Sequence, residues 1–199
     1  MKKSALVLPV LLLLVASVVA LTVMQFRPAT TTQTPTNSTY SHLGGDFELA
    51  SLNGPVRLAD FEGKAVMLFF GFTNCPDVCP TSMAVMRQVF EALPEQQKER
   101  VQGIFISVDP ERDDLERLHA YTQFFHPNIV GITGTKEEID AVTRQYAASY
   151  FFEETDSAMG YMVQHTARTY VIDTQGTIVD LVGEDEPYTT LLTKVRSLL

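Results

Sequence analysis

Residues 65–72 form an uninterrupted apolar run, Ala-Val-Met-Leu-Phe-Phe-Gly-Phe, without one polar side chain. The run is short and rich in aromatic residues, which favours a β-strand buried on both faces. A strand that is buried on both faces must be covered by packing on each side, and helices provide such layers in α/β domains. Residues 101–108 are mostly apolar and predict a second buried strand.

Helical patterns alternate with these two runs. Residues 81–93 carry apolar side chains at helical spacing, and residues 114–125 form an amphipathic pattern that begins with acidic side chains. A third helix is predicted over residues 135–146, where Thr135 and Glu138 have the spacing of a capping box. The alternation of strands and helices predicts a parallel core sheet.

Two hairpin patterns add antiparallel strands to this core. One turns at Asn53-Gly54, and the other turns at residues 173–176. We therefore expect an α/β domain with a central mixed β-sheet, helices on both faces and an N-terminal hairpin. The remaining predicted elements are hairpin strands at residues 47–50 and 56–58, a short strand at 129–132, hairpin strands at 169–172 and 177–182, and a final helix over 187–199 with proline in its first turn.

The N-terminal segment has the pattern of an export signal or a membrane anchor. Lys2 and Lys3 precede an apolar run at residues 5–24, which is as long as the about 20 apolar residues of a membrane-spanning helix. An uncleaved anchor is the favoured interpretation, and a cleaved signal peptide is the alternative. The predicted organisation is an anchor or signal at 1–26, a flexible Thr-rich linker at 27–42 and a folded domain at 43–199 outside the cytoplasmic membrane.

Charge and cysteine content exclude several classes of protein. The formal net charge is −9, whereas nucleic-acid binding requires clustered lysine and arginine, so no nucleic-acid partner is expected. The chain has two cysteines, which is too few for a disulfide-stabilised scaffold or for a four-cysteine zinc or iron–sulfur site. Both cysteines lie within one short segment, Cys75-Pro-Asp-Val-Cys79.

This segment lies between a predicted buried strand and the following helix. Ligands bind at that edge of an open α/β sheet, outside the carboxyl ends of its strands. Cys75 and Cys79 are four residues apart, so their side chains lie on one face if the segment is helical. The spacing fits either a disulfide or two thiolates that converge on one metal ion, and the residues alone leave both interpretations open.

A metal held by only two cysteines needs a third ligand or a preference for low coordination. Cu(I) is a soft ion that favours thiolates, whereas zinc takes four ligands. His165 is the favoured third ligand because it lies just before the strand predicted at 169–172, beside the strand that leads to the cysteines. The other three histidines are His42, His119 and His126.

Three motifs give the chain a resemblance to the Sco/SenC family of exported copper chaperones. The first is Gly-Phe-Thr-Asn-Cys-Pro-Asp-Val-Cys-Pro-Thr at residues 71–81, and the second is Ile-Ser-Val-Asp-Pro-Glu-Arg-Asp at residues 106–113. The third extends from 161 to 173 and contains His165. The resemblance covers roughly residues 43–197, including the order of the elements.

The resemblance implies a thioredoxin-like fold and a copper site formed by Cys75, Cys79 and His165. The implied bound ion is Cu(I), and the site could also bind Cu(II). It implies a role in assembling the binuclear copper A centre in subunit II of cytochrome c oxidase, in a bacterial periplasm. Further implied partners are a periplasmic copper donor and a thiol reductase. One departure is that Gln164 and Thr166 flank the histidine, where the family usually has Asp and Ser, and this could change metal affinity.

Two enzyme classes remain as alternatives. In a thiol–disulfide oxidoreductase, Cys75 and Cys79 would cycle between dithiol and disulfide and keep the oxidase cysteines reduced. In a thiol peroxidase, a low-pKa cysteine would need a nearby arginine, for which Arg87 and Arg168 are candidates. Asp109 ends the second buried strand, and its position fits either a site role or a turn before Pro110.

Overall fold

The computed structural model describes residues 39–156 and 160–199. The predicted anchor at 1–26 and most of the predicted linker at 27–42 lie outside the described residues, so both stay predictions. Within the described ranges, no helix has the length and apolar character that a membrane span requires.

A five-stranded mixed sheet with the strand order β5-β4-β3-β8-β9 forms the centre of the fold. The middle strand β3 (Ala65–Gly71) runs parallel to β4 (Val101–Ser107) and antiparallel to β8 (Arg168–Ile172). On the outer sides, β5 (Ile129–Ile132) runs parallel to β4, and β9 (Ile178–Gly183) runs antiparallel to β8. Every residue of β3 is buried, which confirms the prediction of a strand that is covered on both faces.

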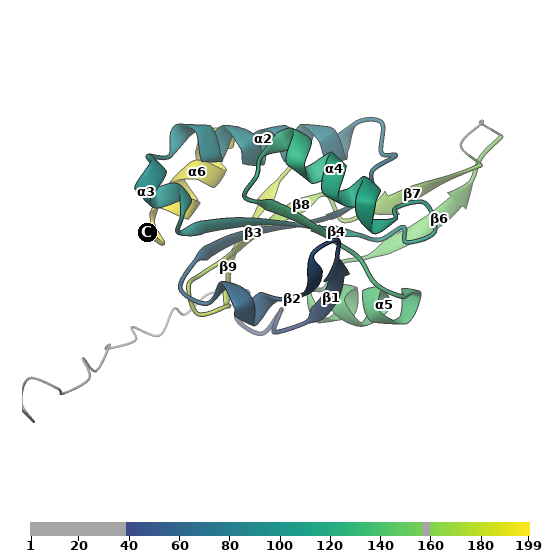
Figure 1. Ribbon diagram of the computed structural model, residues 1–199, viewed down its shortest axis with the longest axis horizontal. Helices are drawn as coiled ribbons and strands as arrows, with labels where there is room; N and C mark the ends of the chain where they lie inside the picture. Colours follow the sequence, from purple (N-terminus) through teal and green to yellow (C-terminus); the bar gives the residue numbers. More distant parts are fainter. Residues whose placement is uncertain (1–38, 157–159) are drawn as a thin grey trace, which may run out of the picture. The chain divides into compact units, whose positions relative to one another are not determined.

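Helices cover both faces of this sheet (Figure 1). Helices α2 (Val78–Ala92), α4 (Leu115–Phe125) and α6 (Tyr188–Arg196) lie on one face. Helix α5 (Lys136–Gln145) lies on the other face, and Thr135 and Glu138 form the capping box that the sequence predicted at its start. The remaining short elements of the described part are β1 (Glu48–Ser51), β2 (Gly54–Arg57), the 3-10 helix η1 (Leu58–Phe61) and α3 (Glu95–Lys98).

Helix α2 begins three residues earlier than predicted, and this places Cys79 in its first turn. Pro80 is the third residue of the helix, where a backbone N–H would have no intrahelical acceptor, so proline does not interrupt the first turn. At the other end of the chain, Pro187 is the N-cap of α6 rather than a residue of its first turn, and that helix ends at Arg196 instead of continuing to 199.

The structure contains a hairpin that the sequence analysis did not predict, formed by β6 (Tyr150–Glu154) and β7 (Tyr161–His165). It is a separate two-stranded sheet that projects from the body of the domain, on the right of Figure 1. Four of the five β6 residues are exposed, so the strand lacks the buried and exposed alternation from which strands are recognised. His165 is therefore the last residue of a strand that the sequence analysis did not predict, and it lies just before β8, as expected.

Candidate metal centre

The three candidate ligands come from two parts of the fold. Cys75 lies in the loop between β3 and α2, where its N–H donates to the carbonyl of Phe72 at 3.3 Å. Cys79 lies in the first turn of α2, and His165 ends β7, 86 residues further along the chain. The ends of β3 and β7 thus meet at one edge of the domain.

The structure brings these three side chains together. Nε2 of His165 lies 3.3 Å from Sγ of Cys79, and the backbone N–H of Cys79 donates to Sγ of Cys75 at 3.4 Å. The two sulfur atoms and a ring nitrogen of His165 all lie within 4.8 Å of one another. Among the described residues, this is the one group of three or more histidine, cysteine or acidic side chains with metal-binding spacing.

The remaining histidines lie elsewhere. The ring of His126 stacks on Phe90 with centroids 4.3 Å apart, and burial lowers its pKa. His119 is a residue of α4, and His42 is exposed before the first strand. Of the four histidines, His165 is thus the one that the described structure places beside the two cysteines.

The imidazole of His165 is oriented by its surroundings. Its Nδ1 lies 3.2 Å from the carbonyl oxygen of Thr166, and because a carbonyl only accepts, Nδ1 carries the proton. The lone pair of Nε2 therefore faces the cysteines, as in histidines that bind metals. The rings of Phe69 and Phe72 contact the imidazole edge-on at centroid distances of 5.8 and 5.9 Å.

Gln164 does not take part in this orientation. It lies on the opposite face of β7, where its side-chain amide donates to Glu153 at 3.2 Å. The departure from the family pattern at this position therefore places a neutral amide beside Glu153, away from the ring of His165.

Gly71 provides the space for one of the sulfur atoms. A Cβ atom at this position would lie 2.8 Å from Sγ of Cys79 and 2.9 Å from the ring of Phe105. Real Cβ atoms essentially never approach so closely, so glycine at the end of β3 leaves room for the buried thiol. The sequence analysis quoted Gly71 within the cysteine motif but did not recognise this role.

The two cysteines differ in their ionisation. The hydrogen bond between the two cysteine side chains is the main cause that lowers the pKa of Cys75 to about 4, against the opposing effect of burial. The same hydrogen bond and burial raise the pKa of Cys79. One proton is thus held on Cys79 while Cys75 is a thiolate, and both cysteines are free rather than joined in a disulfide.

A buried carboxylate holds the cysteine loop in place. Asp113 accepts hydrogen bonds from the N–H of Thr73 at 2.8 Å, from the Thr73 hydroxyl at 2.5 Å and from the Ser107 hydroxyl at 2.7 Å. Arg117 donates to the Thr73 hydroxyl at 2.6 Å and to the side chain of Asn74. The sequence analysis noted the motif at 106–113 without assigning this role to Asp113.

The arginines proposed for a peroxidase have other contacts. Arg87 forms an ion pair with Glu91 at 2.7 Å on the exposed side of α2, and Arg168 is an exposed residue at the start of β8. Arg117 is the arginine whose hydrogen bonds reach the cysteine loop. Asp109 is fully buried and forms an ion pair with Arg112, so it has a structural role beyond a turn.

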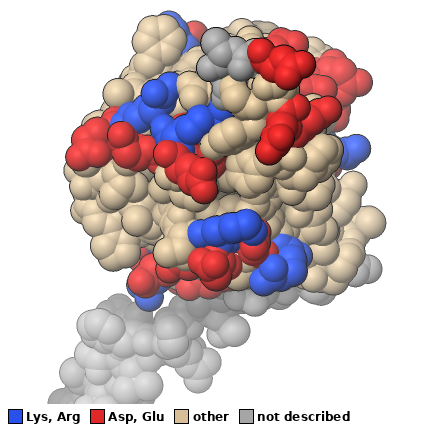
Figure 2. Space-filling view, turned by 90° about the vertical axis from the view of Figure 1, so that its right-hand side faces the viewer, with Lys and Arg blue, Asp and Glu red and all other residues tan. Residues whose placement is uncertain are grey.

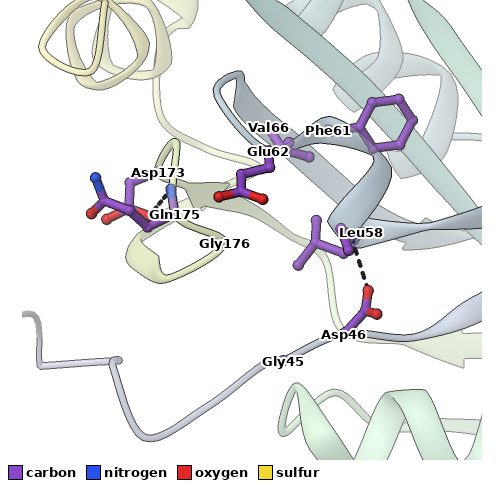
Figure 3. Close-up of a pocket in the computed structure, with 10 residues that line it drawn as sticks. Gly45, Asp46, Leu58, Phe61, Glu62, Val66, Asp173, Gln175 and Gly176 are labelled. Atoms are coloured by element: carbon purple, nitrogen blue, oxygen red, sulfur yellow. Dashed lines mark hydrogen bonds between the residues drawn. The ribbon is translucent and has the colours of Figure 1, made fainter. Parts of the chain in front are cut away.

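A cavity of about 310 Å³ lies at the other end of β3. Figure 3 shows Asp46, Glu62 and Asp173 around it, together with Leu58 and Val66. Val66 lies near the start of β3, whereas the cysteines follow its end, so this cavity is separate from the metal centre.

A family model described as SCO1/SenC matches residues 35–199. The chain belongs to the SCO1/SenC family. Its α/β fold with a central mixed sheet is the thioredoxin-like fold of the Sco structures.

Individual members support this assignment. The mitochondrial SCO2 homolog of Mus musculus is 36% identical over 154 residues, which are 76% of this chain and 60% of the mouse protein. The chain thus spans about 60% of the length of that curated relative. The solution structure of apo Sco1 from Thermus thermophilus matches with a TM-score of 0.71 and 40% identity, covering 79% of this chain and 92% of that one. The structure of Bradyrhizobium japonicum ScoI with copper bound matches with a TM-score of 0.71 and 34% identity, covering 79% and 99%.

Proposed function

We propose that this protein binds one copper ion through Sγ of Cys75, Sγ of Cys79 and Nε2 of His165, and transfers it as a metallochaperone. The observation that carries the proposal is the convergence of these three donor atoms within 4.8 Å. Two sulfur atoms and one imidazole nitrogen form a soft donor set that suits Cu(I), and imidazole also suits Cu(II). Support comes from the B. japonicum relative, whose structure holds copper.

The deprotonated Cys75 gives the proposed site a negative charge that favours a cation. Cys75 is already a thiolate at neutral pH, because the hydrogen bond with Cys79 lowers its pKa to about 4. Binding of Cu(I) forms bonds to both sulfur atoms and to Nε2, and it releases the proton of Cys79 to solvent. Nε2 of His165 faces Sγ of Cys79, while its Nδ1 lies beside the carbonyl of Thr166.

Transfer proceeds by ligand exchange. A thiolate of the partner forms a new Cu–S bond as the bond to Cys75 breaks, and the oxidation state of copper does not change. The proposed acceptor is the binuclear copper A centre in subunit II of cytochrome c oxidase, and the proposed source is a periplasmic copper donor. This assignment of partners rests on the family resemblance.

The proposed location is the periplasmic side of a bacterial inner membrane, with residues 1–26 as a single anchor. Fractionation of cells that express the full chain should recover the protein with inner membranes. Protease added to the periplasmic side should digest the domain. Recovery in the cytosolic fraction would contradict this proposal.

Titration of the reduced protein with Cu(I) against a competing chelator tests the metal site. We expect one ion per chain in the unchanged protein, and a large loss of affinity in Cys75→Ser, Cys79→Ser and His165→Ala. His126→Ala is the matched control, because that histidine stacks on Phe90 outside the donor group and should leave affinity unchanged. Unchanged affinity and spectrum in His165→Ala would exclude the three-ligand site.

A second candidate function is a thiol–disulfide oxidoreductase that keeps the oxidase copper-site cysteines reduced. The low pKa of Cys75 beside a second free cysteine favours it. The Cys75 thiolate would attack the partner disulfide and form a mixed disulfide, and Cys79 would then displace the partner as a dithiol. The test is to incubate oxidised subunit II with the reduced, copper-free protein. Reduction of the subunit II disulfide that persists with the His165→Ala variant supports this function. A subunit II disulfide that stays oxidised excludes it.

A further inference from the structure

His165 lies three residues before β8, but its own strand β7 lies outside the central sheet. Its hairpin, β6–β7, is a separate two-stranded sheet and shares no strand pairing with β3 or β8. The cysteines, in contrast, follow directly from β3 and begin α2. The distance between Nε2 of His165 and Sγ of Cys79 is therefore set both by the short link to β8 and by what attaches the hairpin to the body of the domain.

One attachment lies at Tyr161, at the start of β7. The Tyr161 hydroxyl donates to Oδ1 of Asp109 at 2.8 Å, and Nη1 of Arg112 donates to the Tyr161 carbonyl at 3.0 Å. The Arg112 guanidinium also lies over the Tyr161 ring, 3.7 Å from its centroid. Two hydrogen bonds and a cation–π contact thus join the hairpin to the loop that follows β4.

Burial makes this attachment specific. Asp109 is fully buried, the Arg112 side chain is 17% exposed, and Nε of Arg112 donates to Asp109 at 2.5 Å. Loss of one partner would leave a buried charge without compensation, so the two residues hold each other in one geometry.

The same loop also contacts the cysteine side of the metal centre. The Arg112 guanidinium lies 5.5 Å from the centroid of the Phe72 ring, which packs nearly perpendicular to the imidazole of His165. The next residue, Asp113, holds Thr73 in the cysteine loop through two hydrogen bonds. Residues 109–113 therefore touch both halves of a site whose ligands are far apart in sequence.

We propose that Asp109, Arg112 and Tyr161 are positioning residues that hold His165 beside Cys79 before the metal arrives. The proposal rests on the proposed copper function for its consequence, which is that copper affinity depends on these three residues through His165. They touch neither sulfur nor Nε2 in the described contacts, so they act through the position of the hairpin.

The first measurement uses the copper-free protein. The NMR shifts of the His165 ring report its contacts with Phe69 and Phe72, because aromatic rings shift nearby protons. In Tyr161→Phe and Arg112→Met we expect the His165 signals to move toward those of a solvated histidine. Tyr146→Phe is the matched control: its hydroxyl donates to the carbonyl of Gly45, away from the hairpin, so the His165 signals should stay in place. Unchanged His165 signals in both Tyr161→Phe and Arg112→Met would overturn the proposal, whether or not the protein binds copper.

The second measurement is a double-mutant cycle of Cu(I) affinity. Arg112→Met should weaken binding about tenfold in the unchanged background, within the range for residues that orient a ligand. In the His165→Ala background it should cause no further loss, because the ligand on which it acts is gone. Arg112→Lys keeps the positive charge but lacks the planar guanidinium group, so its Cu(I) affinity should lie between those of Arg112→Met and the unchanged protein.

The outcomes separate the proposal from its alternatives. An equal loss from Arg112→Met in both backgrounds would show a general effect on the domain and overturn the positioning role. Tyr161→Phe, which removes a single hydroxyl, gives the same comparison if Arg112→Met folds poorly. Failure of His165→Ala itself to weaken copper binding would contradict the proposed metal site, while the copper-free NMR experiment would still decide the positioning role.

Discussion

The sulfur atoms of Cys75 and Cys79 lie at different depths. Cys79 is fully buried behind Gly71 and Phe105, whereas 9% of Cys75 is exposed at the rim. The thiolate lies on the outer cysteine, because the hydrogen bond between the pair lowers the pKa of Cys75 and raises that of Cys79. A reagent that approaches from solvent therefore meets a charged sulfur first.

Alkylation of Cys75 should show this low pKa. For an ordinary thiol with a pKa of about 8.5, the rate rises roughly tenfold with each unit of increasing pH below that value, because the thiolate is the reactive form. Cys75 is protonated only below its pKa of about 4, so its rate with iodoacetamide should be flat from pH 5 to 8. The measurement is the rate at Cys75, followed by mass spectrometry of its peptide.

Cys79→Ala provides the control for this profile. It removes the main cause of the low pKa, so the rate at Cys75 should then rise with pH in the lower part of this range. A tenfold rise per unit in the unchanged protein, from pH 5 to 8, would contradict a thiolate at Cys75.

Tyr121 carries a buried hydroxyl that has no hydrogen-bond partner in the described part of the chain. Burial raises its pKa, so the group stays neutral but desolvated. Tyr121→Phe should increase the free energy of unfolding by about 1 kcal/mol, because it removes an unsatisfied polar group. Urea unfolding measures the change, and Tyr146→Phe, which loses a hydrogen bond to Gly45, should shift stability in the opposite direction. A decrease in stability for Tyr121→Phe would refute this account.

At the scale of elements, apolar runs predicted the strands that carry the core. β3 and β4 were recognisable because burial on both faces leaves no polar residue within β3 and few within β4. The helix α5 was recognisable from its capping box. The hairpin β6–β7 was not, because its exposed residues follow no alternation, and its position depends on Asp109 and Arg112, which are distant in sequence.

The same contrast holds within the candidate site. Cys75 and Cys79 could be recognised from local spacing, and His165 from its motif. Asp113 and Gly71 act through contacts that form only in the folded chain: a carboxylate that reaches back 40 residues to Thr73, and a missing Cβ that makes room for a sulfur. Spacing along the sequence contains no direct signal for either role.

The end of strand β3 gives a test at this scale. Gly71→Ala would place a Cβ atom 2.8 Å from Sγ of Cys79, so the sulfur must shift. We expect a loss of about 1–3 kcal/mol in the free energy of unfolding, as for overpacking in other cores, together with weaker Cu(I) binding. Unfolding and chelator competition measure the two effects.

Gly103→Ala in the neighbouring strand is the matched control. Its Cβ would lie 2.8 Å from Ile129, away from the metal centre, so stability should fall while copper affinity per folded chain is kept. Equal effects of the two variants on copper affinity would argue against a special role for Gly71.

For the whole molecule, the proposed metal binding is linked to folding, because the native state brings the three donors together. Charged side chains of both signs are interspersed with uncharged ones on the face that Figure 2 draws, rather than gathered in a single basic patch. Among the described residues, the group with metal-binding spacing lies between the sheet edge and the hairpin, so stabilisation by a metal ion is expected there.

Thermal unfolding with Cu(I) measures that stabilisation. At a free concentration about 100 times the dissociation constant, a ligand of the native state adds about 2.7 kcal/mol. For a domain of this size, that raises the melting temperature by roughly 5–10 °C. Cys75→Ser should show a much smaller shift at the same copper concentration. An equal shift in that variant would mean that copper binds elsewhere.

The separate origin of the three donors has a consequence for when copper can be captured. Cys75 and Cys79 are four residues apart and can meet in a chain that has not folded, but His165 joins them only after β7 has formed and docked. A chain that has not yet folded would carry the two thiols without the imidazole beside them. The three-donor set is thus complete only when the β6–β7 hairpin is in place.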